Sequence, residues 1–322
     1  MSDDSLKQHI GEEIKQFFIL RSVEIRYKKS DNSPYAVLEL GYPHGRIWAN
    51  IWENTAEFTA EYGGGDVVKI QGKIEQYRET TQINIKRIRK ALPSDEVYPE
   101  DLLPQYPGDT TQLVKRLEKL IKSIQHPSLV SLCRHMLIEG DTAGLFRTAP
   151  GGKLWHHGYV GGLLEHTVNM TEICMKIAER YDDADKNVLC AGALLHDIGK
   201  IKAYMSVPYI DYSDEGRLIG HIVLGHDMVR EEIKKIDDFP EEIEKQLLHL
   251  ILSHQGSLAN ASPVVPMTLE AIILHHVDEI DAQVNAYIRV KKEQNLPGRK
   301  WSNYVNLADR FFYFGEQEQS EA

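Results

Sequence analysis

The chain has 322 residues, of which 42% are hydrophobic and 26% charged, and its formal net charge at pH 7 is −11. This length suggests two domains, and the composition is that of a globular chain with a real core. No apolar run reaches the roughly 18 residues that a membrane span needs. The polar, acidic first residues lack a secretory signal, and three cysteines without a CxxC pair exclude a disulfide framework and a thiolate zinc site. We therefore expect a cytoplasmic protein that does not bind membranes.

Residues 1–92 predict a small β-barrel. β-Branched and aromatic residues recur in rough alternation in FFILRSVEIRYKK, YAVLELGYPHGRIWANIWE and DVVKIQGKIEQYRETTQINIKRIRKA, which predicts five strands. The turn clusters SDNSP and GGGD interrupt these runs, and a short segment before GGGD is expected to be helical. Five strands with a small helix between the third and the fourth indicate an OB-like barrel.

The barrel segment also differs in charge from the rest of the chain. Residues 14–92 carry 13 Lys or Arg against 9 Asp or Glu, a net charge of +4, which leaves −15 for the remainder. OB surfaces bind single strands by stacking bases on aromatic rings and by placing cations along the backbone. The candidate contacts are Tyr35, Trp48, Trp52, Tyr77, Arg46, Lys73, Arg78 and Lys86. The alternative is that at least half of these aromatics belong to the barrel core and that the cations only face solvent.

Residues 93–110 predict a linker, because the stretch LPSDEVYPEDLLPQYPG holds four of the 13 prolines. Residues 111–298 show apolar positions at helical spacing, which predicts an all-α bundle. Residues 299–322 contain an aromatic segment followed by a polar tail. Its RFFYF stretch is apolar enough to bury against the chain's own core or against a second copy, so a homo-oligomer is one expectation.

The histidines and aspartates of the helical region carry its chemistry. Eleven of the 14 histidines lie between residues 135 and 276. In the stretch ALLHDIGK a carboxylate next to an imidazole is costly to bury unless something binds it. The candidates embedded in apolar helical segments are His166, His196, Asp197, His221, His254, Asp278 and Asp281. Such a mixed set suits a divalent ion held between facing helices. His135, His249 and His275 are expected to be ordinary hydrogen-bonded core residues. His226 follows His221 by five residues and lies off its helical face, so only His221 of that pair is favoured as a ligand.

These residues resemble the HD-domain metal-dependent phosphohydrolase superfamily, whose pattern is H…HD…D on a helical core. The resemblance implies four metal ligands, here His166, His196, Asp197 and Asp278. Asp281 would orient a ligand from behind, and Lys200, His221 and His254 are the catalytic candidates. His221 and His254 lie where members with extra histidines bind a second ion. A single ion with both histidines contacting phosphate fits equally well.

The whole chain is similar to the YhaM-type 3′–5′ exoribonucleases. The segments that carry this resemblance include KLWHHGYVGGLLEHT, LHLILSHQG, SPVVPMTLEAIILHHVDEIDA and KWSNYVNLADRFF. It implies an enzyme that hydrolyses single-stranded RNA, with single-stranded DNA as a second substrate, from the 3′ end to nucleoside 5′-monophosphates. It also implies one or two divalent ions, with Mn²⁺ expected first and Fe²⁺, Co²⁺, Ni²⁺, Zn²⁺ and Mg²⁺ as alternatives.

Two other functions stay open. An HD-domain nucleotide or cyclic-nucleotide phosphohydrolase would use the same ligands on a small substrate, although it would have little need of the barrel. A catalytically inert OB/HD nucleic-acid-binding protein would keep the fold without hydrolysis. The complete ligand set together with Lys200 argues against that second alternative.

Overall fold

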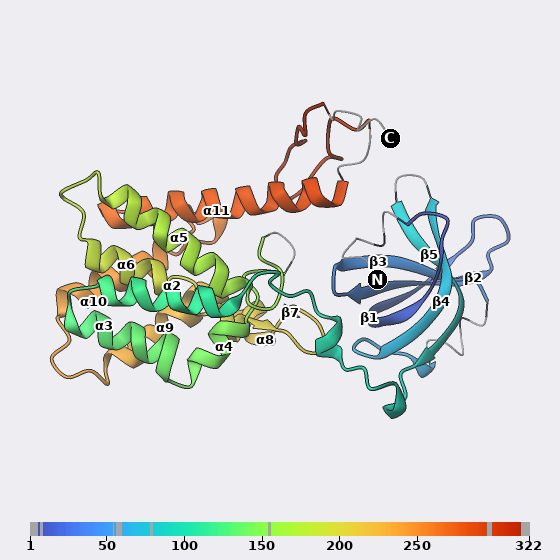
Figure 1. The fold of residues 1–322 in the computed structure, drawn as a ribbon, viewed down its shortest axis with the longest axis horizontal. Helices are drawn as coiled ribbons and strands as arrows, with labels where there is room; N and C mark the ends of the chain where they lie inside the picture. The colour runs from blue at the N-terminus through green and yellow to red at the C-terminus, as the bar shows by residue number, and fades with distance from the viewer. Residues whose placement is uncertain are drawn as a thin grey trace. The chain divides into compact units, whose positions relative to one another are not determined.

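The computed structural model describes residues 6, 9–53, 55, 60–77, 80–153, 156–294 and 298–316. The chain forms two compact units (Figure 1). The first comprises Met1–Gln105 together with Ser206–Ile210, and the second comprises Tyr106–Met205 together with Asp211–Ala322. The sequence did not indicate that Ser206–Ile210 belongs with the first unit.

The first unit contains a closed barrel with the strand order β1-β2-β3-β5-β4. Its strands are β1 (Glu13–Tyr27), β2 (Pro34–Tyr42), β3 (Gly45–Ile51), β4 (Val67–Tyr77) and β5 (Thr80–Lys90). β1 pairs with β4 along its first half and with β2 along its second half. A register shift between Leu20 and Ser22 separates the two halves, and such a bulge bends a strand so that the sheet can close. The core includes Phe18, Leu38 and Ile70, which are fully buried.

The barrel confirms the OB-like fold that the alternation predicts. Four of the five pairings between neighbouring strands of the closed barrel are antiparallel. The pairing of β3 with β5 is parallel and spans Trp48–Asn50 and Gln82–Asn84. The helix expected before GGGD falls mostly outside the described residues. Two short 3₁₀ turns, η2 (Pro93–Asp95) and η3 (Pro99–Leu102), follow β5 in the segment predicted as a linker.

The second unit is helical, as predicted. Its elements are α2 (Thr110–Ser123), α3 (Pro127–Arg134), η4 (His135–Glu139), α4 (Thr142–Thr148), α5 (Gly162–Ala178), α6 (Lys186–Leu195), α7 (Lys200–Ala203), β6 (Tyr204–Met205), β7 (Asp211–Tyr212), α8 (Asp214–Leu218), α9 (His221–Ile233), α10 (Glu241–Ser253), η5 (Leu258–Asn260) and α11 (Leu269–Gln294). Within the described residues, none of the helices is long and apolar enough to cross a membrane.

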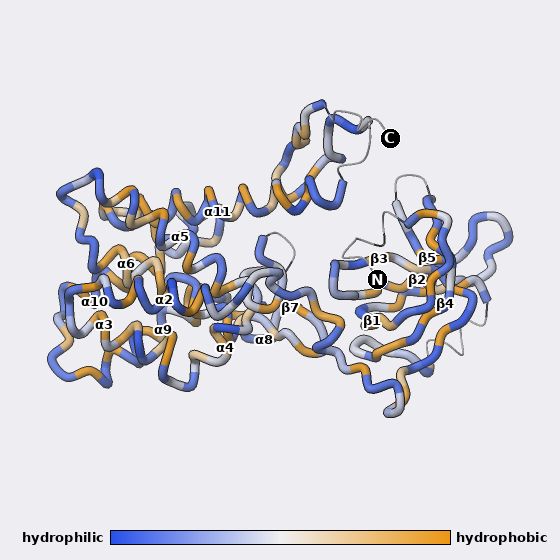
Figure 2. Tube along the Cα trace, in the orientation of Figure 1, coloured by the Kyte–Doolittle hydropathy of each residue, from blue (hydrophilic) through white to orange (hydrophobic). Residues whose placement is uncertain are grey.

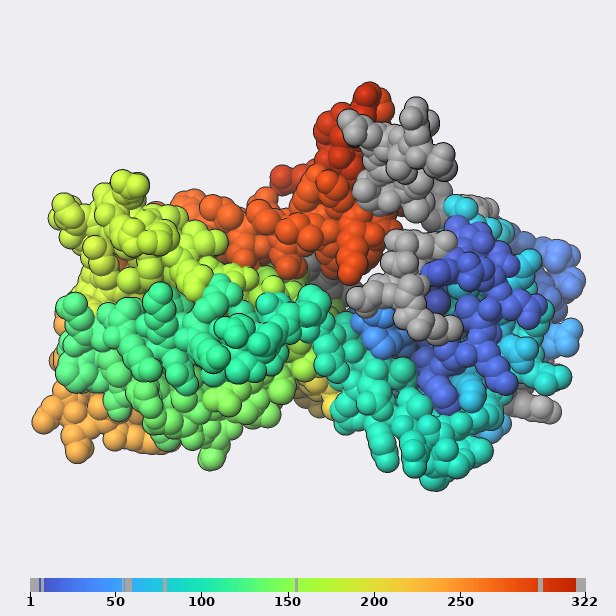
Figure 3. All heavy atoms as spheres, viewed as in Figure 1, coloured from blue at the N-terminus to red at the C-terminus, as the bar shows by residue number. Residues whose placement is uncertain are grey.

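Helix α6 forms the centre of this unit. Eight of its ten residues are buried, and it contacts α2, α3, α5, α10 and α11. The hydropathy colouring shows apolar residues along α6 (Figure 2). Helices α2 and α3 contact it, and their atoms form much of the visible face of this unit in the space-filling view (Figure 3). The Asp185 carboxylate starts the helix by accepting hydrogen bonds from the backbone N–H groups of Asn187 and Val188. Because α6 is apolar on all sides, the polar residues that end it lie inside the core.

Candidate metal centre

Six polar side chains converge at the inner end of α6. They come from five helices and are His166 on α5, His196 and Asp197 directly after α6, His221 at the start of α9, His254 directly after α10 and Asp278 on α11. The imidazoles of His166, His196 and His254 are completely buried. Buried nitrogen and oxygen atoms of this kind need a hydrogen-bond partner or a bound ion.

Four atoms that could each bind a metal ion lie around one point. They form the first of two groups of metal-ligand atoms, which we call donor groups. The Nε2 atom of His166 lies 3.4 Å from Nε2 of His196, 3.5 Å from Oδ2 of Asp197 and 3.2 Å from Oδ1 of Asp278. Nε2 of His196 lies 3.3 Å from Oδ2 of Asp197. With bonds of about 2.1 Å to a divalent ion, neighbouring ligand atoms lie about 3.0–3.4 Å apart. The spacing of these four donors therefore fits one ion.

The second group lies on the other side of the same carboxylate. Oδ1 of Asp197 is 3.4 Å from Nε2 of His221 and 3.6 Å from Nε2 of His254. Among the described residues, none of these three buried atoms has a hydrogen-bond partner. Leaving a buried polar atom unsatisfied costs about 1–3 kcal/mol. Three such atoms facing one another fit a bound cation, and Asp197 presents one oxygen to each group.

The outer nitrogens of the histidines fix which atom faces the centre. Nδ1 of His196 donates to the carbonyl oxygen of Ala193 at 2.9 Å, and Nδ1 of His254 donates to that of Ile251 at 2.7 Å. A histidine that donates through Nδ1 keeps its Nε2 lone pair free for a metal. His166 also turns Nε2 toward the centre, because its Nδ1 lies 2.7 Å from the Asp281 carboxylate. Asp281 thus contacts His166 from behind, at the place expected for an orienting residue.

Charge and burial act differently on the two groups. Burial lowers the pKa of His221 to about 3 and that of His254 to about 4, so both rings are neutral at physiological pH. Burial also disfavours the charged form of His166, but hydrogen bonds with Asp278 and Asp281 outweigh it and raise its pKa to about 9. Burial works against the charge of Asp197 as well, yet the neighbouring Lys200 and His196 hold its pKa well below the usual range. Carboxylates and neutral imidazoles are ligands that divalent ions accept.

Lys200 lies beside the centre rather than in bulk solvent. Its Nζ atom is 2.5 Å from Oδ2 of Asp197, and the side chain is buried. Gly199, just before it, lets the turn approach the start of α9, because a Cβ atom there would lie 2.0 Å from the carbonyl oxygen of His221. Close packing against the start of α9 therefore requires a glycine at this position.

Asp281 belongs to a hydrogen-bond network that the sequence did not predict. Nε2 of His157 lies 2.8 Å from the Asp281 carboxylate, and Nδ1 of His157 lies 3.1 Å from Glu165. Tyr159 donates a hydrogen bond to Glu165. His156 is also close, since its ring centroid is 5.4 Å from that of His166. In the sequence, only the adjacent pair His156 and His157 in KLWHHGYVGG hinted at this network. Its spacing did not show that the two histidines lie beside His166 and Asp281.

Four other histidines, His135, His226, His249 and His275, have partners outside the two donor groups. His135 faces Glu232 at 3.2 Å and His226 faces Asp227 at 2.9 Å. His249 accepts a hydrogen bond from the backbone of Met267. His275 donates to the carbonyl oxygen of His254 at 2.8 Å, so it contacts the backbone of a candidate ligand. The sequence did not predict that contact.

The barrel candidates are mostly on the surface. Trp48, Trp52 and Tyr77 are exposed, which contradicts the alternative that half of the aromatics belong to the core. Tyr35 and Trp52 stack with ring centroids 4.9 Å apart. Arg46 pairs with Glu39 at 3.2 Å, Lys86 pairs with Glu13 at 2.5 Å and Lys73 is exposed on β4. Arg78 lies outside the described residues.

Comparison with known proteins assigns the chain to a family. Residues 163–283 match the HD domain family, a segment that contains every member of both donor groups. The chain is 30% identical over 315 residues to the 3′–5′ exoribonuclease YhaM of Bacillus velezensis and to that of Bacillus subtilis strain 168. Each alignment covers 97% of this chain and 98% of the relative. The chain belongs to the YhaM exoribonuclease family.

Membership of the YhaM family confirms the resemblance seen in the sequence, and the HD domain implies a divalent metal. The barrel is also similar to the second OB-fold domain of replication protein A from Methanococcus maripaludis, with 19% identity over 25% of this chain and 85% of that chain and a TM-score of 0.21. The family assignment rests on the alignment with YhaM over 97% of the chain. The HD match rests on residues 163–283.

Proposed function

We propose that this protein is a metal-dependent enzyme that removes nucleotides from the 3′ end of single-stranded RNA. The observation that carries the proposal is the trio Asp197 Oδ1, His221 Nε2 and His254 Nε2, which are buried, mutually facing and without hydrogen-bond partners in the described residues. They adjoin a second donor group inside an HD domain. The relatives that span the whole chain are named 3′–5′ exoribonucleases.

Each donor group has a role in this proposal. His166, His196, Asp197 and Asp278 would hold one ion. Asp197 through its other oxygen, with His221 and His254, would hold a second; in a one-ion centre the two histidines would contact the scissile phosphate instead. When bound, a divalent ion supplies an activated water near neutral pH and offsets negative charge on the phosphate.

The chain's own residues complete the chemistry. Asp281 keeps the Nδ1 proton of His166 in place, so that Nε2 faces the centre. Lys200, held at 2.5 Å from Asp197, places a positive charge beside the phosphate as the charge on the leaving oxygen develops. In-line attack of water on the phosphorus of the last phosphodiester breaks its bond to the 3′-oxygen of the preceding nucleotide. The product is a nucleoside 5′-monophosphate and an RNA one residue shorter.

Manganese is the proposed metal. The carboxylates of the set suit Mn²⁺, the imidazoles suit Fe²⁺, Ni²⁺ and Zn²⁺, and Mg²⁺ prefers sites built from oxygen ligands alone. Fe²⁺, Co²⁺, Ni²⁺ and Zn²⁺ accept the same donors and would be compared in the same assay. The proposed compartment is the cytoplasm, where the three buried free cysteines remain reduced.

A cleavage time course tests this function. RNA labelled at its 5′ end is incubated with the protein and Mn²⁺, and the products are resolved by length. We expect a ladder that shortens from the 3′ end, and we expect EDTA and the H221A substitution to abolish it. H226A is the matched control, because His226 lies on the same helix but contacts Asp227 and neither donor group. Intact RNA alongside hydrolysis of nucleotides or cyclic nucleotides would instead support the small-substrate phosphohydrolase.

A further inference from the structure

The outer faces of three barrel strands carry an array of cations. The β1–β4 and β4–β5 registers place Lys15, Gln71 and Arg87 in one cross-strand row. They place Lys69 beside Arg89 in the next row. We call these five residues the basic face. Side chains in such rows point to the same side of a sheet and lie within reach of one another, so their charges act together.

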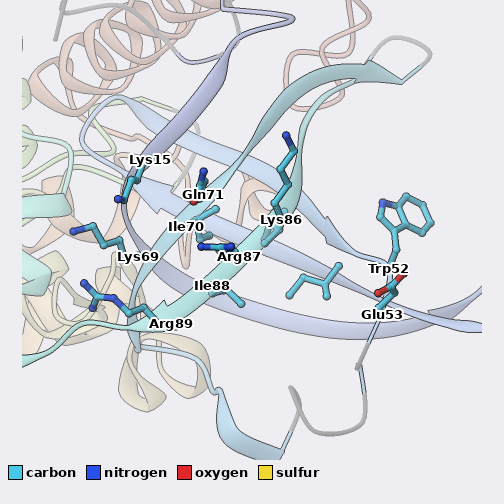
Figure 4. A pocket seen from close by; sticks show the side chains of 12 residues that line it. Lys15, Trp52, Glu53, Lys69, Ile70, Gln71, Lys86, Arg87, Ile88 and Arg89 are labelled. Carbon is cyan, nitrogen blue, oxygen red and sulfur yellow. The ribbon is translucent and has the colours of Figure 1, made fainter.

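A groove runs along the basic face (Figure 4). It encloses about 820 Å³, and Ile70, Ile85 and Ile88 are among its apolar lining residues. The groove has a structural origin in the barrel closure. The parallel pairing of β3 with β5 ends at Asn50 and Asn84, while β5 continues to Lys90. Beyond Asn84, the described residues include no strand beside that edge of β5, and the groove forms there.

The cations of the basic face are only partly neutralised. Asp95 holds Arg89 at 2.6 and 2.8 Å and lies 3.7 Å from Lys69. Lys15 and Arg87 are exposed, and within the described residues neither forms an ion pair. Among the described residues that line the groove, Glu53 is the one that is acidic. The groove therefore carries net positive charge, with two exposed cations available to a ligand.

The opposite half of the barrel is less basic. On β3, Arg46 lies 3.2 Å from Glu39, and Glu39 also faces Arg21 at 3.4 Å. The positive charge there is compensated inside the protein. Half of the candidates that the sequence predicted, Tyr35, Arg46, Trp48 and Trp52, lie on or next to β2 and β3. Trp52 and Lys86 line the groove itself.

We propose that the basic face binds the phosphate backbone of the single-stranded RNA substrate. This inference rests on the proposed function. Arg87 and Arg89 point to the same side of one strand about 6.8 Å apart, a step comparable with that between successive phosphates of an extended strand. Phosphate contacts carry no base preference, which suits an enzyme that must move along any sequence. A row of cations above an apolar groove matches a flexible polyanion better than it matches a compact ligand.

Binding of a labelled single-stranded RNA of about 16 nucleotides, the upper end of OB site sizes, tests the proposal. Affinity is measured with the full-length protein in EDTA at several salt concentrations, so that no cleavage occurs. Each phosphate contact to a single strand contributes about 0.7 to the salt slope. We therefore expect K15Q/R87Q to lower the slope by about 1.4 and the affinity at 0.1 M salt by about 25-fold. The control R26Q/K29Q removes the same charge from the end of β1 and the following turn.

The outcomes separate the two proposals. If K15Q/R87Q binds like the wild type, or if R26Q/K29Q weakens binding as much, the basic face is not the RNA site. If R46Q/W48A alone removes the salt-dependent binding, the β2–β3 half is the site and the inference is overturned. Cleavage of the same RNA with Mn²⁺ is measured separately. A wild type that binds RNA through the basic face but never shortens it would refute the proposed function and leave this inference standing.

Discussion

Metal binding should release about one proton per protein at pH 7.5, and His166 is its source. The pKa of this histidine is raised to about 9 because the hydrogen bonds of Asp278 and Asp281 outweigh its burial. At pH 7.5 such a group is about 97% protonated. A ligand must be neutral, so the proton leaves when the ion binds. His221 and His254, with pKa values of about 3 and 4, are already neutral and contribute nothing.

The sign and size of the pH dependence follow from the raised pKa. Because His166 is protonated below pH 9, the apparent affinity of its donor group falls about tenfold for each pH unit below that value and levels off above it. At pH 7.5 the proton reduces the affinity about 30-fold, or by about 2 kcal/mol. The assay is isothermal titration calorimetry with Mn²⁺ in buffers of different ionisation enthalpy, repeated between pH 6 and 9.

A matched pair of variants isolates the cause. D281N removes the carboxylate that contacts Nδ1 of His166 and should reduce both the proton release and the pH slope. E279Q removes the same charge from an exposed position on α11 and should leave both unchanged. Proton release near zero in the wild type, with an affinity that is flat from pH 6 to 8, would refute the assignment of His166 as a protonated ligand.

Three further predictions concern activity and stability. H254A should lower kcat at least 100-fold, because a ligand is lost, whereas H249A, outside both donor groups, should leave kcat unchanged; equal effects would contradict the assignment. Removing metal with EDTA should lower Tm, since an ion at 100 times its Kd stabilises the fold by about 2.7 kcal/mol; an unchanged Tm in calorimetry would argue against a bound ion. G199A should destabilise by at least 1–3 kcal/mol, because its Cβ would lie 2.0 Å from the His221 carbonyl oxygen. Gly144 has open space around it, so G144A should leave the free energy of unfolding unchanged or raise it. Urea titration of both variants measures this difference.

The sequence predicted the two folds and the ligand-type residues for physical reasons that act locally. Strand alternation and helical spacing depend on neighbouring residues, and a His–Asp pair inside an apolar run is anomalous in any fold. These features sufficed to single out His196 and Asp197. Membership of the family then confirmed the assignment of the fold and of the HD domain.

What the sequence could not show depends on long-range packing. Which oxygen of Asp197 faces which histidines follows from how α9 packs on α7 and how α10 packs on α6. The contact of His157 with Asp281 joins residues 124 positions apart. The basic face arises because the β1–β4–β5 registers align Lys15 with Gln71 and Arg87, and no spacing rule within one strand reveals that row.

The most direct test of the central claim compares two labels on one RNA. The same single-stranded RNA is labelled at its 5′ end or at its 3′ end and incubated with the protein and Mn²⁺. A 3′–5′ exoribonuclease releases the 3′ label at once as a mononucleotide, while the 5′ label shortens stepwise. If the 5′ label is released first, or if both labels appear in internal fragments, the proposed polarity is wrong.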